Sequence, residues 1–261
     1  MMYFYPMNKP LILLSPSKGM RPGAAFPHSA LRPLMFPVET EKVVAVVQKL
    51  SEKARRDLFK VSDKLWPKVN AMWSKEPLHY LRPNPGVAGI HAYSGEAFKF
   101  LDSETLSDGA LARAQQRLVV LSALYGAVHA DAVVVPYRLE MLSKLAVGKA
   151  KNLYGLWKPI LTNWINEGNV DFVVDACSGE YSNAIDWKAV EKPVVAVDFK
   201  QRKNGQLKSV SSFSKQARGA FVRWMLEADV HTISGLEAFN QLGYELHSNE
   251  DNKMVFLRDS D

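Results

Sequence analysis

The spacing of apolar positions predicts a helical segment early in the chain. Apolar side chains recur at three- and four-residue steps over residues 43–58, which is typical of a helix that buries one face. Ser62 is placed to cap a second helix over residues 65–73, and Pro67 falls in its first turns, where a missing backbone donor costs little. We therefore expect two helices joined by a tight turn. Three lysines surround that joint: Lys60, Lys64 and Lys68.

Two more helices follow from the same spacing. The apolar stripe over residues 111–125 begins after Ser107, which can cap it, and Gly126 is placed to end it in a left-handed conformation. Apolar residues with helical spacing also predict a helix over residues 152–166, with Pro159 as a kink or a first-turn residue.

Short apolar runs between polar turns predict strands. Residues 11–14 and 172–177 are compact enough to be buried strands. Asn204-Gly205 is a strong hairpin signal, and a polar stretch separates two more runs near the C-terminus. The runs that flank these turns are residues 194–199 and 207–213, then 244–247 and 254–257. Because helices and strands mix without a clean βαβ rhythm, we expect one α+β or mixed α/β domain over residues 1–261.

Candidate chemistry gathers after Pro136, which lacks a backbone donor and holds the preceding residue in extended geometry. A stiff bend therefore precedes Tyr137, Arg138 and Glu140, close to the segment that carries Tyr125. Polar groups beside an apolar run are costly to bury unless they are paired. Two interpretations are open: an Arg138–Glu140 pair that holds a loop, or a set of ligand-binding residues.

Polar residues also follow the predicted strands. Ser15-Pro-Ser-Lys18 comes after the first strand, and a hydroxyl-rich turn with a lysine can cradle a phosphate, although Walker spacing is absent. The alternative is a turn whose serines bond their own backbone. Glu180 and Tyr181 follow the strand at residues 172–177, where α/β folds place ligands. The alternative for Glu180 is a helix cap or a surface acid.

A third candidate lies on a helix that Ser214 is placed to cap. Lys215 and Arg218 are three residues apart, so they share one helical face close to the predicted N-terminus. The partial positive charge of a helix N-terminus favours anions. The pair is therefore a candidate anion site.

Charge is distributed unevenly along the chain, whose net charge is +6. Residues 42–75 hold nine Lys and Arg against three acids, residues 199–223 hold seven against none, and residues 224–261 hold two against eight. A field with a positive side is typical of proteins that bind nucleic acid. The alternative is that the two basic segments are separate solvated faces.

Other features narrow the class of protein. A single cysteine, Cys177, excludes internal disulfides and suits a reducing cytoplasm, and a redox sensor would need an exposed thiolate and usually a resolving cysteine. The histidines show no ligand spacing beyond His247 and Glu250 in a predicted turn, so we expect neither a metal nor a cofactor. The apolar run at residues 11–14 is too short for a signal peptide or a membrane span.

Several segments in one order resemble the YaaA family of bacterial peroxide-stress proteins. The central pair is Ser122-Ala-Leu-Tyr-Gly126 followed by Pro136-Tyr-Arg-Leu-Glu-Met141. The resemblance covers residues 11–258. It departs from the family pattern at Ser17, where Ala is expected, in the insert at residues 20–37, and in the first ten residues. The other matching segments are residues 11–18, 62–65, 152–157, 178–181, 215–219 and 239–244.

The resemblance implies a compact domain of unusual topology with a basic cleft and a helix-hairpin-helix-like element. The joint near residue 60 would be that element, although Lys60-Val-Ser-Asp63 stands where the hairpin usually has Gly-x-Gly. It also implies a role in peroxide defence that limits damage from unincorporated iron. We therefore expect a non-enzymatic binder of duplex or distorted DNA that ignores sequence. The expected phosphate contacts are Ser15, Lys18, Lys60, Ser62, Lys64, Lys68, Lys215 and Arg218.

The rival hypothesis is an enzyme that acts on a nucleotide or another phosphorylated substrate. Ser15, Lys18, Lys215 and Arg218 would hold the phosphate. Glu180 or Glu140 would serve as the base, and Tyr125 or Tyr181 as the acid.

Overall fold

The computed structural model describes residues 10–21, 32–82, 86–203 and 205–259. These residues form an eight-stranded sheet. Seven strands follow one another in a single order, and the eighth, β8 (Gln206–Lys208), pairs only with β7 (Val194–Lys203). The order of the other strands is β4 (Gly126–His129), β3 (Leu118–Ser122), β1 (Leu11–Leu14), β6 (Val173–Ala176), β7, β10 (Lys253–Asp259) and β9 (Glu245–Glu250). Each step from β3 through β1, β6 and β7 to β10 is parallel, whereas β4, β8 and β9 pair antiparallel. The mixed α/β class is confirmed.

The three central strands are buried along their whole length, as expected for parallel strands covered on both faces. This burial corrects one prediction. Helix α7 (Asp108–Arg117) begins after the capping Ser107, as predicted, but ends at Arg117, and the chain continues as β3 rather than as helix to Tyr125. A short apolar run such as Leu-Val-Val-Leu fits a helix or a strand equally well, and its β-branched residues favour the strand.

Gly126 takes the left-handed conformation predicted for it, with φ 71°, but it opens β4 instead of ending a helix. A side chain is excluded there because a Cβ would lie 2.5 Å from the ring of Trp157. Trp157 is buried and donates its indole N–H to the carbonyl of Ala123 at 2.9 Å. The turn after β3 is therefore held by α8 (Leu153–Glu167), the helix that was predicted to start at Asn152.

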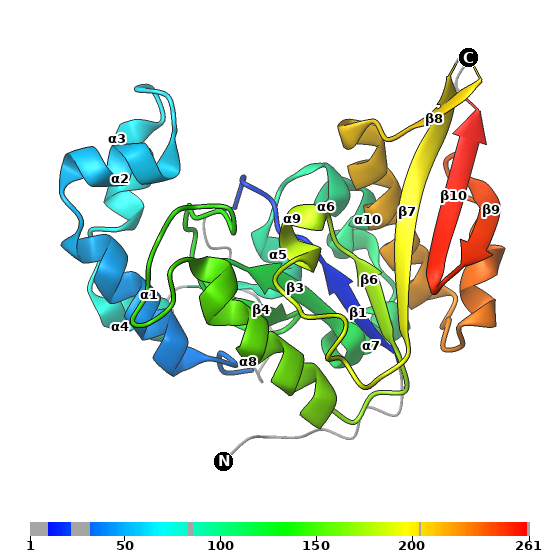
Figure 1. Ribbon diagram of the computed structural model, residues 1–261, viewed down its shortest axis with the longest axis horizontal. Helices are drawn as coiled ribbons and strands as arrows, with labels where there is room; N and C mark the ends of the chain where they lie inside the picture. The colour runs from blue at the N-terminus through cyan, green and yellow to red at the C-terminus, as the bar shows by residue number, and fades with distance from the viewer. Residues whose placement is uncertain (1–9, 22–31, 83–85, 204, 260–261) are drawn as a thin grey trace.

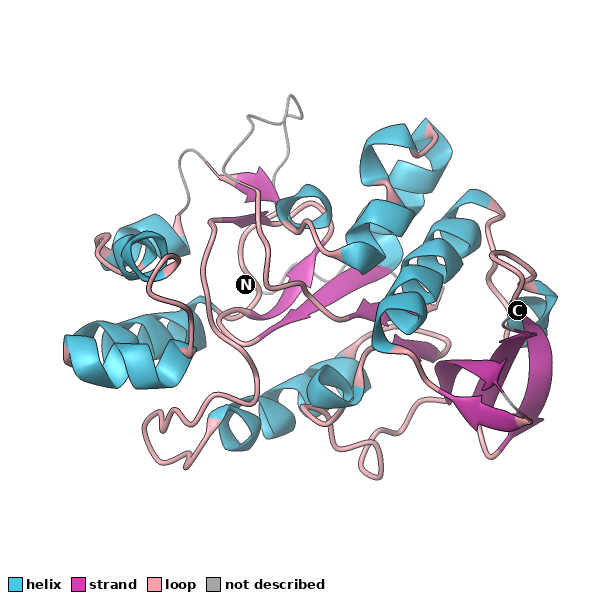
Figure 2. Cartoon of the chain, turned by 90° about the horizontal axis from the view of Figure 1, so that it is seen from above, coloured by secondary structure: helices cyan, strands magenta, loops and turns pink. Residues whose placement is uncertain are grey.

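Helices lie on both faces of the sheet (Figures 1 and 2). α8 covers one face, while α6 (Glu96–Leu101), α7 and α10 (Ser211–Glu227) cover the other. α8 is capped by Asn152, whose Oδ1 accepts from the Gly155 N–H at 2.8 Å. The cap predicted at Ser214 is wrong. α10 starts three residues earlier, and the buried Ser214 hydroxyl donates to the carbonyl of Phe199 at 3.0 Å.

The segment predicted to form two helices, residues 43–73, contains parts of three: α1 (Pro37–Lys49), α2 (Glu52–Phe59) and α3 (Trp66–Met72). A fourth helix, α4 (Pro77–Leu81), follows and was not predicted. The single helix predicted over residues 43–58 is split because Leu50 turns extended and Ser51 caps α2. The cap predicted at Ser62 is also wrong: its carbonyl accepts from the N–H groups of Leu65 and Trp66, one turn before α3. In Figure 1, α2 and α3 stand away from the sheet, and we call residues 52–72 the α2–α3 unit.

Both predicted hairpins are present, as β7–β8 and β9–β10. The strand predicted over residues 207–213 is too long, because β8 ends at Lys208 and residues 211–213 already belong to α10. Among the described residues, none of the helices combines the length and apolar character needed to span a membrane. The short remaining elements are β2 (Val87–Ala88), β5 (Val133–Val134), α5 (Gly89–Ala92), α9 (Gly179–Ser182) and two 3₁₀ turns, Ser103–Thr105 and Ser234–Ala238.

Candidate functional site

The sheet has a topological switch point at β1. β3 pairs with one side of β1 and β6 with the other, so the carboxyl ends of all three parallel strands open at one edge. Open α/β sheets bind ligands at such an edge because the connecting loops separate there. We call this place the carboxyl edge and define it by residues 15–18, 122–125 and 177–181.

A serine pair joins the loops that follow β1 and β6. Ser15 Oγ accepts from the Ser178 N–H at 2.8 Å and lies 3.1 Å from Ser178 Oγ. The Ser17 hydroxyl does not contact Ser178 but accepts hydrogen bonds from the N–H groups of Ser94 and Gly95, at 3.2 and 3.0 Å. Ser17 thus connects the Ser-Pro-Ser turn to the start of α6. Of the two serines in the turn, only Ser15 directs its hydroxyl group to the loop that follows β6.

Charged side chains close the edge in a short chain of ion pairs. Glu140 forms two ion pairs. Its Oε2 lies 2.8 Å from Lys18 Nζ, and its Oε1 lies 3.1 Å from Arg138 Nη2. The ion pair between Arg138 and Glu140 is therefore present, as the loop-holding interpretation of the sequence predicted. Glu180 lies alongside, where its Oε1 accepts from the Leu142 N–H at 3.3 Å and its carbonyl accepts from Tyr154. This network holds residues 138–142 against the loops after β1 and β6.

Four tyrosines lie beneath this network. Tyr137 OH lies 2.8 Å from Ser122 Oγ and 3.4 Å from Tyr93 OH, and the rings of Tyr125 and Tyr137 pack edge to face. Burial raises the pKa of all four phenols, including Tyr181, so each stays protonated near neutral pH. Tyr93 was missed in the sequence, since no local signal links it to the others.

A buried carboxyl group lies below the serine pair. Asp175 Oδ1 accepts from the Cys177 N–H at 2.9 Å, and Oδ2 accepts from Ser182 Oγ at 2.5 Å. Burial raises the pKa of Asp175, and the Arg218 guanidinium opposes that shift. Cys177 is buried, as predicted, and burial followed by the nearby Asp175 carboxyl raises the pKa of its thiol. Asp175 was missed, although an acid inside an apolar strand is itself a signal, because burying it costs free energy unless it is paired.

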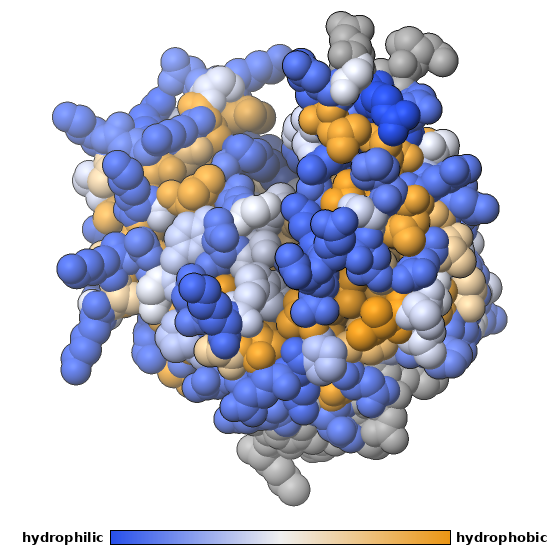
Figure 3. Space-filling view, turned by 45° about the vertical axis from the view of Figure 1, so that its right-hand side comes forward, coloured by the Kyte–Doolittle hydropathy of each residue, from blue (hydrophilic) through white to orange (hydrophobic). Residues whose placement is uncertain are grey.

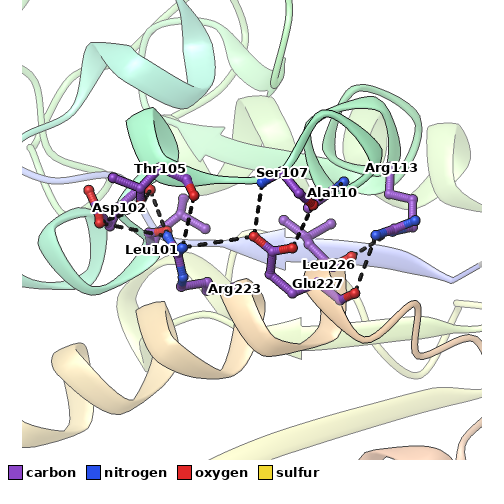
Figure 4. Close-up of polar contacts among 9 residues, drawn as sticks. All are labelled: Leu101, Asp102, Thr105, Ser107, Ala110, Arg113, Arg223, Leu226 and Glu227. Atoms are coloured by element: carbon purple, nitrogen blue, oxygen red, sulfur yellow. Dashed lines mark hydrogen bonds and ion pairs between the residues drawn. The ribbon is translucent and has the colours of Figure 1, made fainter.

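α10 carries Lys215 and Arg218, and its C-terminal part is held by several polar contacts (Figure 4). Arg223 donates to the carbonyls of Leu101, Asp102 and Thr105 at 3.1, 2.7 and 3.1 Å. Glu227 accepts from the N–H and the hydroxyl of Ser107 at 3.0 and 2.6 Å. Arg223, one of the cations of the second basic segment, is therefore structural.

α10 also packs without a gap on α6. A Cβ on Gly219 would lie 1.9 Å from the carbonyl oxygen of Ala97, so only glycine fits. The close approach places Lys215 near Glu96, whose pKa is lowered first by hydrogen bonds from Gln216 and Lys99 and last by the Lys215 charge. The position of α10 relative to the carboxyl edge is thus set by packing.

The chain matches the family described as "Peroxide stress protein YaaA" over residues 11–250. A UPF0246 protein of Flavobacterium psychrophilum is 32% identical over 95% of this chain and 99% of its own length. A UPF0246 protein of Shewanella loihica is 36% identical over 95% of this chain and 98% of its own length. This chain belongs to the YaaA family of peroxide stress proteins.

Four of the segments that resemble the YaaA family meet at the carboxyl edge, around β1. They contain Ser15, Tyr125, Glu140 and Ser178 and come from three distant parts of the chain. The segment that contains Lys215 and Arg218 lies on α10. Among the residues that the structure describes, no three His, Cys, Asp or Glu side chains lie close enough together to hold a metal ion.

The cations of the first basic segment lie elsewhere, on the α2–α3 unit. Lys60, Ser62, Lys64 and Lys68 are all exposed, and Lys60 adopts a left-handed conformation at the end of α2. Figure 3 shows the molecular surface hollowed at the top of the view, with hydrophilic side chains on both sides. One shared anion-binding concavity, formed by these lysines together with Lys18, Lys215 and Arg218, stays a prediction.

Proposed function

We propose that this YaaA-family protein binds DNA through phosphate contacts, without reading sequence, and that it acts in the cytoplasm to limit damage from iron and peroxide. The observation that carries the proposal is the charge of the α2–α3 unit. Lys60, Lys64 and Lys68 are exposed and, within the described ranges, no acidic side chain forms an ion pair with them. Exposed cations without internal partners are free to replace the counterions of a phosphate backbone.

Two of the three acids of the α2–α3 unit, Glu52 and Asp63, are already engaged. Asp63 pairs with Arg56 at 2.8 Å, and Glu52 accepts from the Trp66 indole N–H at 3.0 Å. Arg56 also lies over the Trp66 ring, with its Cζ 4.6 Å from the centroid. The acids therefore hold the two helices together through Arg56 and Trp66. The lysines, on a helix-hairpin-helix-like joint, remain as the contacts for phosphate.

The other cations of the proposed basic cleft are Lys18, which follows β1, and Lys215 and Arg218 on α10. Ser15 and Ser62 would add hydroxyl donors. Contacts of this kind fix position on the backbone but carry no sequence information. Duplex or distorted DNA would therefore bind with similar affinity whatever its base composition.

A second candidate is an enzyme that acts on a nucleotide or another phosphorylated substrate. The observation that favours it is the switch-point location of Ser15, Lys18, Glu140 and Glu180, where α/β folds place ligands. Tyr125 or Tyr181, each protonated near neutral pH, would be the acid, and Glu180 or Glu140 the base. Release of product from nucleotides would support this activity, and its absence with intact DNA binding would favour the first proposal.

The test is the affinity for two duplexes of equal length and different sequence, measured by fluorescence anisotropy from about 50 to about 200 mM salt. We expect equal affinities for both sequences. We also expect a steep linear fall of log affinity with log salt, with a slope of about −0.9 per neutralised phosphate. Affinity that is unchanged across this range of salt would contradict the proposal.

A further inference from the structure

One cation of the site has donor groups that the protein does not use. Arg218 lies on α10 with its Nε buried, and no hydrogen-bond acceptor reaches that atom within the described residues. A guanidinium has five N–H donors, and a buried donor without an acceptor is costly. Arg138 Nε also lacks an acceptor, but Arg138 is held through Nη2, which donates to Glu140 Oε1 at 3.1 Å. Arg218 as a whole is only partly buried, so its remaining guanidinium N–H groups are positioned for an acceptor that comes from outside.

The acids near Arg218 do not supply that acceptor. The positive charge of Arg218 influences the pKa of Asp175, so the two groups are in electrostatic range, yet no ion pair within 4 Å joins them. Both carboxyl oxygens of Asp175 already accept from Cys177 and Ser182. Glu140 is held by Lys18 and Arg138. The carboxylates that could pair with the Arg218 guanidinium are therefore already bound to other groups.

Two hydroxyl groups lie beside the same point. The start of α6 joins α10 to the serine loop, because Gln216 donates to Glu96 at 2.8 Å and Ser17 Oγ accepts from the Gly95 N–H at 3.0 Å. Burial raises the pKa of the Cys177 thiol, and both the Ser15 hydroxyl and the Arg218 charge oppose that shift. Ser15 Oγ and Ser178 Oγ are 3.1 Å apart, and both residues are partly exposed at the strand ends. When one of these hydroxyls donates to the other, a proton of the pair is still available to an anion. The Cys177 thiol, which stays neutral, does not repel such an anion.

We propose that Ser15, Ser178 and Arg218 form a receptor for one phosphate monoester, which is the 5′-phosphate of a DNA end or of a free nucleotide. The inference deepens the proposed DNA binding. A monoester has three terminal oxygens and carries about −1.5 to −2 charge near neutral pH. A planar guanidinium binds two of those oxygens side by side, and the hydroxyl pair reaches the third. An internal diester has a single charge and a sugar on each side, so it fits a partly buried receptor less well.

The experiment compares a 5′-phosphorylated duplex with the same duplex carrying 5′-hydroxyl ends. The measured quantity is the ratio of the two affinities for the full-length chain. We expect the phosphate to improve binding about tenfold, the increment of one charge-assisted hydrogen bond. Arg218→Lys keeps the charge but loses the fork, and we expect it to bring the ratio close to one. Ser178→Ala should do the same without any change of charge.

Lys64→Ala is the matched control, because it removes a cation from the α2–α3 unit. It should weaken both duplexes equally and keep the ratio. Adenosine monophosphate and inorganic phosphate, titrated into the complex, distinguish a free nucleotide from a DNA end. If adenosine monophosphate does not displace the 5′-phosphorylated duplex, the receptor binds only DNA ends. If adenosine monophosphate displaces that duplex, the receptor binds free nucleotides as well.

A wild-type ratio of one with intact, salt-dependent DNA binding would overturn the receptor and leave the proposed function standing. Binding of adenosine monophosphate that depends on Ser178, without any DNA binding, would uphold the receptor and overturn the proposed function. A ratio that is preserved in both Arg218→Lys and Ser178→Ala, with unchanged melting temperatures, would place the phosphate elsewhere and sink the inference.

Discussion

The carboxyl edge and the α2–α3 unit both carry cations, but they hold them in opposite ways. At the edge, Lys18 and Arg138 share the carboxylate of Glu140, and the tyrosines below are buried. On the α2–α3 unit, Lys60, Lys64 and Lys68 are exposed and, in the part of the chain that is described, have no acidic partner. The edge is built to position a group by geometry. The unit is built to attract a polyanion by charge.

This difference has a consequence for solution behaviour. Exposed charges are screened by salt, whereas partly buried pairs are screened much less. Binding that depends on the α2–α3 unit should therefore weaken steeply with salt. The structure of the carboxyl edge should depend instead on packing and buried hydrogen bonds, so substitutions there should change stability first.

The largest expected effect is that of Gly219→Ala on stability. The new Cβ would lie 1.9 Å from the carbonyl oxygen of Ala97, so α10 would have to move off α6. Overpacking typically costs about 1–3 kcal/mol and occasionally more, and the clash with a backbone oxygen puts this site above about 3 kcal/mol. Urea unfolding measures the loss. Gly179→Ala is the control, since nothing lies within 4 Å of a Cβ there. Equal unfolding midpoints for the two variants would contradict the packing of α10.

A smaller effect is expected when one serine from each region is compared. Ser122→Ala removes the partner of Tyr137 and leaves the buried N–H groups of Leu124 and Tyr125 without their acceptor. We expect a loss of about 1–3 kcal/mol in the free energy of unfolding. Ser62→Ala, on the exposed joint, should stay within about 0.5 kcal/mol. If both serines cost the same, the edge is not the more tightly built region.

The sequence predicted the elements whose local signals agree with one another. β1 and β6 are short buried runs bounded by polar turns, and α8 combines a cap with helical spacing. α7 was extended wrongly into β3 because an apolar run of that length fits both structures. The predictions that Ser62 and Ser214 cap helices were wrong. A serine beside an apolar stripe can also lie in a turn, as Ser62 does, or hydrogen-bond across the core, as Ser214 does.

The candidate site was predictable only where strand ends identify it. Ser15, Glu180 and Tyr181 follow strands, so a general rule about α/β sheets selects them. Lys18 as the partner of Glu140, and Tyr93 as the neighbour of Tyr137, depend on the order of strands in the sheet and have no local signal. Asp175 could have been found, since an acid in an apolar strand requires a partner.

The most direct test of the account compares two double variants that each remove two positive charges. Lys64→Ala with Lys68→Ala removes them from the α2–α3 unit. Lys188→Ala with Lys192→Ala removes them from the connection that leads to the start of β7, at the opposite, amino edge of the parallel strands. The account predicts that the first variant reduces the salt slope of duplex DNA affinity by about two, whereas the second leaves the slope unchanged. Equal slopes for both variants would contradict it.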